Sequence, residues 1–178
     1  MRISNIVLIS IFMLITIVSM AQDEIKQRPS PAAISSMHYK DAYIKVTYGQ
    51  PHKRGREIFG KLVPYGEVWR TGANEATEIT LTKDILLNEK LLKAGTYSIF
   101  TIPEKDKWTI IINADLGLWG SYNYNQKSDV FRFDVPVQKS DVVYEPFTIS
   151  FNQRNELADL LLQWDTVKIV IPIKFVNQ

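Results

Sequence analysis

The chain has 178 residues, 21 Lys and Arg against 19 Asp and Glu, and no cysteine. This near balance of charge gives no support for nucleic acid as a partner, because a surface that binds phosphates needs an excess of Lys and Arg. The absence of cysteine excludes disulfides, thiol catalysis and thiolate metal sites.

The N-terminus has the pattern of a secretory signal peptide. A short basic start precedes an almost unbroken apolar run from 6 to 18, and Ser19, Met20 and Ala21 form a small-x-small cleavage pattern. Residues 1–21 are therefore predicted to be removed, and the run is too short for a comfortable transmembrane helix. The alternative is an uncleaved anchor. We expect an exported protein, periplasmic or extracellular, with no stable membrane span after cleavage.

The mature chain would run from Gln22 to Gln178, which is the size of one domain. Residues 22–34 are polar and include two prolines, and they are predicted to form a flexible leader. No internal repeat, low-complexity tract or linker follows. Residues 35–178 are therefore predicted to form a single domain.

Apolar and polar residues alternate almost everywhere after the leader, and this period of two is typical of strands with one buried face. Pro136 indicates that the strand before it ends there or lies at an edge. The stretch 157–164 is ambiguous between a helical turn and a strand, and an antiparallel pair with 167–175 is the simpler interpretation. In chain order, strands are predicted at 43–48, 78–82, 85–87, 91–92, 96–102, 108–112, 129–135, 147–151 and 167–175.

No segment of the mature chain has a sustained period of 3.6 residues. About eight to ten short strands with turn signals between them predict an all-β fold, a single antiparallel β-sandwich or jelly-roll-like domain. The irregular segment 49–77 is expected to fold over one end or edge of it.

The stretch from Tyr48 to Thr77 is the best candidate site. It connects two predicted strands, has no clean period and contains five of the eight glycines. Arginines can hold a carboxylate, phosphate or sulfate, and neighbouring amide and acidic groups suit a polyhydroxylated ligand. The ligand-binding candidates in this stretch are Arg54, Arg56, Glu57, Trp69, Arg70, Asn74 and Glu75.

A structural cap is the alternative interpretation of the same stretch, because long ordered connections serve both purposes. In a cap, Trp69 and Tyr65 would plug the core. Arg70 would then pair with Glu75 or with a carbonyl group.

A second irregular stretch, 113–125, adds Trp119 and Tyr122 to the ligand-binding candidates. Exposed aromatic rings beside asparagines can stack on sugar faces while the amides bond the hydroxyls. The simpler interpretation makes Trp119 and one tyrosine core plugs and the asparagines turn residues.

Little in the sequence points to catalysis. The two histidines, His38 and His52, lie in no metal-binding pattern, and there is no nucleophile elbow, dinucleotide fingerprint or phosphate loop. No catalytic residue, metal or cofactor is therefore predicted. A two-carboxylate hydrolase would have to draw on a non-specific set of acidic residues, namely Glu57, Glu67, Glu75 and Asp115.

Four blocks follow one another along the chain in the order GREIFGKLVPYGEVWRTGANEAT, AGTYSIFTIP, WTIII and WGSYNY. Together they resemble an exported bacterial family catalogued as domain of unknown function 2911, over roughly residues 30–173. The resemblance implies a single β domain in the periplasm or at the exterior of Bacteroidota-like bacteria. It implies no catalytic residues, because the family has no established activity.

Three functions stay open. The favoured hypothesis is a non-catalytic binding module for a small polar or glycan-like ligand in the cell envelope, and it would be strengthened if the candidates Arg70, Asn74, Glu75, Trp119 and Tyr122 converged on one open pocket. A structural or protein-interaction domain, whose partner the sequence does not identify, would need an exposed apolar patch. A hydrolase would need at least two of the four carboxylates in one cleft.

Overall fold

The structure is a computed structural model that describes residues 28–176. The expected signal peptide, residues 1–21, lies outside the described residues. The elements in chain order are β1 (Ala32–Tyr39), β2 (Ala42–Gly49), β3 (Thr77–Leu81), β4 (Ile85–Leu87), β5 (Lys90–Leu92), β6 (Gly95–Pro103), β7 (Lys107–Asn113), the 3-10 turn η1 (Gln126–Ser128), β8 (Asp129–Pro136), β9 (Gln138–Arg154) and β10 (Leu157–Phe175).

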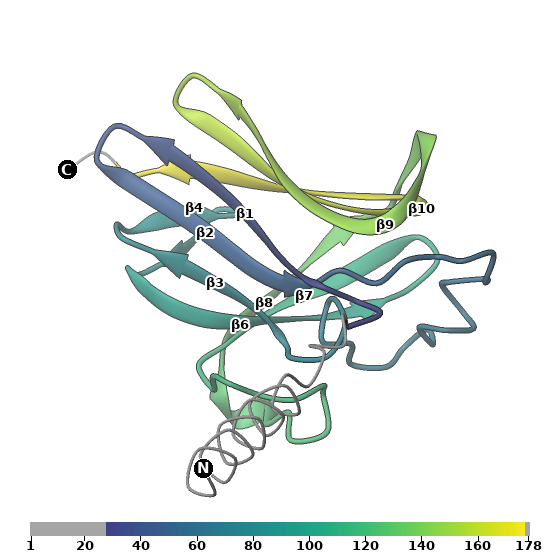
Figure 1. The fold of residues 1–178 in the computed structure, drawn as a ribbon. Helices are drawn as coiled ribbons and strands as arrows, with labels where there is room; N and C mark the ends of the chain where they lie inside the picture. Colours follow the sequence, from purple (N-terminus) through teal and green to yellow (C-terminus); the bar gives the residue numbers. More distant parts are fainter. Residues whose placement is uncertain (1–27, 177–178) are drawn as a thin grey trace, which may run out of the picture.

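The strands form two antiparallel sheets, and the predicted all-β fold is confirmed (Figure 1). One sheet has the order β1-β2-β3-β6-β7-β8, and the other has the order β5-β4-β10-β9. β8 ends at Pro136 and is an edge strand, as the proline indicates, since proline cannot donate to a further neighbour. Within residues 28–176, no helix has the length and apolar character needed to cross a bilayer.

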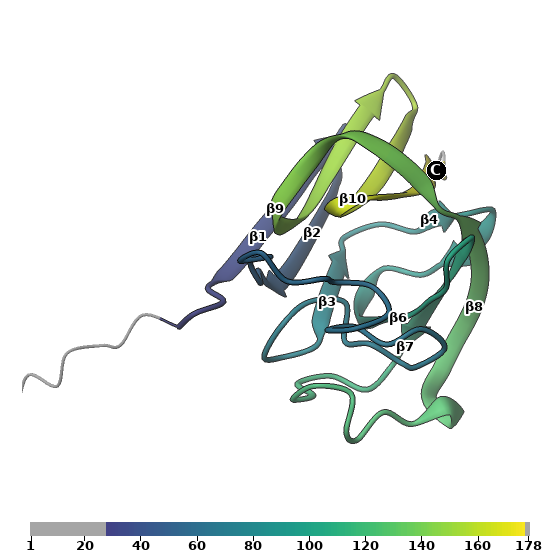
Figure 2. The same cartoon turned by 90° about the vertical axis from the view of Figure 1, so that its right-hand side faces the viewer.

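The chain passes from one sheet to the other at Val137, where β8 runs directly on into β9 (Figure 2). β9 and β10 then form one long hairpin, with register shifts around Asp165. The expected antiparallel pair between 157–164 and 167–175 is therefore wrong, because both stretches belong to the single strand β10 and pair with β9.

The first strand lies earlier than the sequence indicates. β1 begins at Ala32, inside the range 22–34 assigned to the leader, and it pairs with β2 along its whole length. Its first five residues are mostly small and only Met37 of the strand is buried, so the strand is held largely by backbone pairing at the sheet edge. A strand of this kind has little apolar signal.

The core fills the space between the sheets. Alternate residues such as Ile44 and Val46 of β2 point into it, whereas their neighbours face solvent. β6 and β7 differ, because both of their faces are buried. On the outer face, Phe100 and Ile111 form a second, smaller apolar cluster that the irregular stretch 114–125 covers with Leu118 and Tyr124.

A polar network fastens this covering stretch to the start of β8. The Tyr124 hydroxyl donates to Asp129 at 3.0 and 2.8 Å, and Asn113 Nδ2 donates to the same carboxylate at 2.8 Å. Arg132 binds both Asp129, with Nε at 2.5 Å from Oδ2, and the Tyr124 hydroxyl. Burial, and then the hydrogen bond and charge of Asp129, raise the pKa of Tyr124 from 10.0 to about 12, although Arg132 acts in the opposite direction.

This network predicts a loss of stability at high pH. A phenol with a raised pKa binds its proton more tightly in the folded state, so its contribution to the free energy of unfolding is complete below pH 10 and disappears as the pH rises towards about 12. In urea titrations across that range, the wild-type protein should lose stability more steeply than Tyr124→Phe. Tyr122→Phe, at a position 82% exposed, is the control and should behave like the wild type. Equal slopes for wild type and Tyr124→Phe would contradict the prediction.

Candidate functional site

The two irregular segments, 50–76 and 114–128, meet at one end of the sandwich, which faces the viewer in Figure 2. Gly120 N donates to Asn74 O at 2.9 Å, and Ala76 N donates to Leu118 O at 2.8 Å. Between these bonds, Glu75 and Trp119 form an isolated β-bridge. The fold therefore brings both sequence-predicted regions together.

Segment 50–76 is closed at its base by two glycines. Ala73 N donates to Gly49 O at 3.2 Å, and the backbones at this crossing touch. A Cβ at Gly49 would lie 1.9 Å from the carbonyl oxygen of Ala73, and one at Gly72 would lie 2.8 Å from the carbonyl oxygen of Gly49. Only residues without a side chain permit this approach.

The segment is ordered along its length by backbone hydrogen bonds. At its start, Lys53 N donates to Glu145 O at 2.8 Å, and the Lys53 ammonium pairs with Asp165 of β10 at 2.7 Å. Further along, Trp69 exchanges two bonds with Thr101 of β6, at 2.7 and 2.9 Å. The expectation that this segment folds over one end of the domain is therefore confirmed.

Trp69 belongs to an aromatic cluster at this end of the core. Its ring stacks on Trp164 at a centroid distance of 6.0 Å and meets Trp108 and Phe147 edge-on at 5.9 and 5.2 Å. Trp69 is only 8% exposed, and its Nε1 donates to Gly72 O at 3.1 Å. The tryptophan thus has the plugging role that the cap interpretation gives it.

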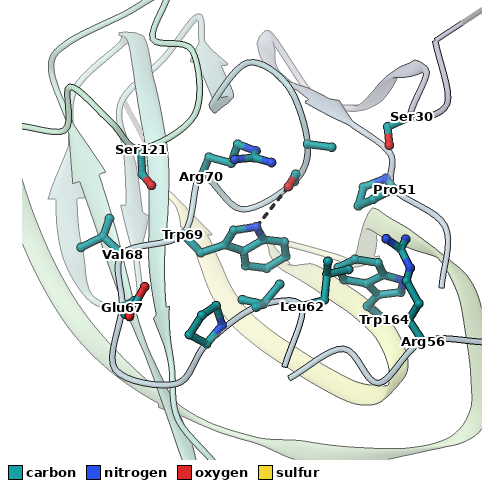
Figure 3. Close-up of a pocket in the computed structure, with 14 residues that line it drawn as sticks. Ser30, Pro51, Arg56, Leu62, Glu67, Val68, Trp69, Arg70, Ser121 and Trp164 are labelled. Atoms are coloured by element: carbon teal, nitrogen blue, oxygen red, sulfur yellow. Dashed lines mark hydrogen bonds between the residues drawn. The ribbon is translucent and has the colours of Figure 1, made fainter. Parts of the chain in front are cut away.

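A cleft of about 310 Å³ opens beside Trp69, and we call it the Arg70 cleft (Figure 3). Its walls combine the two stacked indoles with charged groups, hydroxyls and small apolar side chains. Its lining includes Arg56, Glu67, Trp69, Arg70, Ser121 and Trp164, together with Leu62, Val63 and Pro64. Ser30 lies at the rim opposite Ser121 (Figure 3).

Of the two arginines that line this cleft, Arg70 is the one without a hydrogen-bond or ion-pair partner among residues 28–176. Its Nε is buried and has no hydrogen-bond partner among residues 28–176. None of the ion pairs in that part of the chain includes Arg70. The pairing with Glu75 or a carbonyl group that a cap would require is therefore not formed.

The other arginines of the segment are occupied. Arg54 Nη2 donates to Pro29 O at 2.9 Å. Arg56 donates to the carbonyl groups of His52 and Lys53, at 2.6 and 3.0 Å, so it braces the turn that carries it while it lines the cleft. Of the three, only Arg70 keeps its guanidinium free.

A second cleft, of about 410 Å³, lies beside the first, and we call it the Glu75 cleft. The Glu75 carboxylate accepts from Arg28 Nη1 at 2.8 and 3.2 Å, and this hydrogen bond and then its own backbone lower the pKa of Glu75. Arg28 also lies over the exposed ring of Trp119, 5.9 Å from its centroid. Asn74 donates to Ser30 O at 2.9 Å. These contacts hold the first residues of the described domain in place. The side chains of Asn74 and Glu75 are therefore already hydrogen-bonded.

The five residues expected to converge on one pocket do not do so. Arg70 lines the Arg70 cleft, whereas Asn74 and Glu75 line the Glu75 cleft. Trp119 is 54% exposed and Tyr122 82% exposed, so neither is a core plug.

The candidate carboxylates are also divided. Glu67 lines the Arg70 cleft and Glu75 the other, while Glu57 and Asp115 line neither. Neither cleft therefore holds two of the four groups that a two-carboxylate hydrolase needs. Among residues 28–176, no three His, Asp or Glu side chains come together as a possible metal site.

Sequence reasoning missed three residues of the Arg70 cleft, namely Ser30, Ser121 and Trp164. Trp164 follows a run of leucines in β10, and that run made the secondary structure of the stretch ambiguous in the sequence. The tryptophan reaches the cleft because its ring stacks on Trp69. The serines carry no local signal. Their position follows from the contact between the two irregular segments.

Searches of curated proteins and of solved structures return no protein similar to this chain. A family model, in contrast, matches residues 30–173. The matched range starts just before β1 and ends inside β10, so it includes the Arg70 cleft, all of the Glu75 cleft except Arg28, and nearly the whole described domain. The chain therefore belongs to the family described as "Protein of unknown function (DUF2911)".

Proposed function

We propose that the protein is a non-catalytic binding module of the bacterial cell envelope and that the Arg70 cleft holds a small polar, glycan-like ligand. The observation that carries this proposal is the make-up of the cleft walls. The indole N–H groups of Trp69 and Trp164 are already bonded to Gly72 O and Glu145 O, both at 3.1 Å. The two rings are 8% and 2% exposed, so they contribute apolar edges to the cleft wall beside arginine and hydroxyl groups, a combination found in sugar sites.

The size of the cleft also favours a small ligand. Ligand pockets span about 300–1,000 Å³, and this cleft lies at the lower limit. A binding role rather than a hydrolytic one agrees with the separation of Glu67 from the other candidate carboxylates. The envelope setting rests on the apolar run at 6–18, and protein recovered from producing cells should accordingly begin at Gln22.

The test blocks the cleft without touching its charges. Ser121→Tyr places a ring at the rim, and we expect it to weaken binding of neutral and acidic sugars at least about tenfold, because a filled cleft excludes the ligand. Ser36→Tyr on the exposed face of β1 is the matched control. Calorimetry and the fluorescence of the two cleft tryptophans measure binding to monosaccharides and peptidoglycan fragments.

Two outcomes would count against the binding module. One is the absence of any response from the wild-type protein across the set of ligands. The other is binding that Ser121→Tyr leaves unchanged while the variant folds normally. A structural or protein-interaction role would then be favoured, and the adjacent exposed valines Val142 and Val143 of β9 would be the first surface to examine.

A further inference from the structure

The Nε group of Arg70, a half-buried residue, is an exception to the way proteins treat buried hydrogen-bond donors. A guanidinium is protonated at every physiological pH and carries five donors, so burial without an acceptor is unfavourable. Nearly all buried donors in folded proteins have a partner, and an exception indicates a missing ion, water or ligand. The buried Nε of Arg70 has no partner among residues 28–176.

Two carboxylates occur near Arg70, and neither forms an ion pair with it. Glu67 lines the same cleft but is not within ion-pair distance of Arg70. Glu75, five positions along, is paired with Arg28. The guanidinium thus stays unpaired although one carboxylate lines the same cleft and another lies five positions along the chain.

The backbone around Arg70 is held rigidly. Trp69 is bonded through both its N–H and its carbonyl group to Thr101, and Arg70 O accepts from Thr77 N at 3.1 Å. Thr71 has a φ of 57°, which is strained for a β-branched residue, and its hydroxyl donates to Thr101 Oγ1 at 3.1 Å. Strained backbone retained by surrounding bonds is frequent at ligand sites. The backbone that carries the guanidinium is consequently fixed before a ligand arrives, which lowers the entropy lost on binding.

We propose, building on the binding function above, that the group held in the Arg70 cleft is a carboxylate and that the ligand is a small sugar acid. Arg70 supplies the bidentate fork that matches a carboxylate. The charges lining the cleft, Arg56 and Arg70 against Glu67, leave one net positive charge. A monoanion balances that charge, whereas a phosphate dianion would exceed it. The Ser30 and Ser121 hydroxyls at the two rims are placed to bind the hydroxyls of the same ligand.

The experiment compares ligands that differ only in the anionic group. The pairs are glucuronate with glucose, and N-acetylmuramic acid with N-acetylglucosamine, with glucose 6-phosphate as the phosphate arm. The wild-type protein should bind the carboxylate member of at least one pair about tenfold or more tightly than its neutral partner, as expected for a charged hydrogen-bonded contact. Arg70→Gln keeps a polar side chain with N–H donors but removes the charge and the bidentate fork, and it should abolish this preference. Lys61→Ala removes a charge from the same segment outside the cleft and should leave it intact.

A stability measurement separates a ligand-binding arginine from a structural one. Without ligand, Arg70→Met should melt at the same temperature as the wild-type protein or higher, because a half-buried charged group with an unpaired buried donor has been replaced by an apolar chain. A clear fall in melting temperature would assign Arg70 a structural role and overturn the proposal.

The remaining outcomes distinguish this inference from the function on which it rests. If neutral and acidic sugars bind equally, and Arg70→Gln changes neither, the binding module stands and the carboxylate is ruled out. Tighter binding of glucose 6-phosphate than of glucuronate would replace the carboxylate by a phosphate. If no sugar binds at all, both the inference and the proposed function fail.

Discussion

Gly49→Ala is expected to destabilise the domain by about 3 kcal/mol or more, because the new methyl group meets backbone rather than a movable side chain. The Cβ would lie 1.9 Å from the Ala73 carbonyl oxygen, 2.7 Å from its carbonyl carbon and 3.2 Å from its nitrogen. Relief requires the two ends of segment 50–76 to separate, which would break the bond from Ala73 N to Gly49 O. The expected fall in melting temperature is roughly 10 °C for a domain of this size.

Gly55→Ala is the matched control in the same segment. Gly55 has a φ of 70° and nothing within 4 Å of its added Cβ, so alanine there meets conformational strain but no clash. Strain of this kind costs about 1–2 kcal/mol. Thermal and urea unfolding of both variants measure the difference. If Gly49→Ala were no more harmful than Gly55→Ala, the tight crossing at Gly49 would be disproved.

Trp69→Ala is the second substitution with a large expected effect. Removal of a buried tryptophan leaves a cavity and costs about 3–5 kcal/mol. Here it also removes the partner on which Trp164 stacks and one side of the Arg70 cleft. We therefore expect a large loss of stability in urea unfolding together with loss of any ligand binding. Trp69→Phe keeps part of the packing, so its stability in urea should lie between those of the wild-type protein and Trp69→Ala.

Trp119→Ala is the control for that measurement, since it removes the same side chain from a position 54% exposed. Exposed substitutions of this type usually change stability by no more than about 0.5 kcal/mol. A loss at Trp119 comparable with that at Trp69 would mean that the irregular stretch 114–125 contributes to the core more than its burial indicates.

Most strands were predictable from sequence. Alternation placed β2 and β3, which bury one face, within a residue or two of their observed ends. β6 and β7, which bury both faces, were located as closely by their β-branched and aromatic residues. β1 escaped detection because an edge strand held by its backbone needs no apolar stripe. β10 was split because Asp165, at a φ of 54° and a register shift, interrupts the alternation that would have marked one continuous strand.

The candidate site was predictable only in part. Glycine spacing and charge identified segment 50–76 and, within it, Arg70 as a candidate ligand residue. The sequence did not distinguish Arg70 from Arg54 and Arg56, because backbone carbonyl partners leave no mark on residue types. The partner of Arg54 is 25 positions away, whereas those of Arg56 lie within its own turn. Likewise, nothing in the local sequence indicates that Glu75 and Arg70 line different clefts.

The pairing of β4 with β10 sets the order in which this molecule can assemble. Leu87 pairs with Ile173, 86 positions later, so the apolar face of the β4–β5 hairpin stays uncovered until β10 has been synthesised. Closing a loop of that length before any contact rewards it slows folding and extends the time for which apolar surface is exposed. The topology therefore predicts that the sheet containing β4 and β10 is completed slowly and only after the whole chain has been made. Such a delay is a hazard in a crowded compartment and an advantage for a polypeptide that must cross a membrane before it folds.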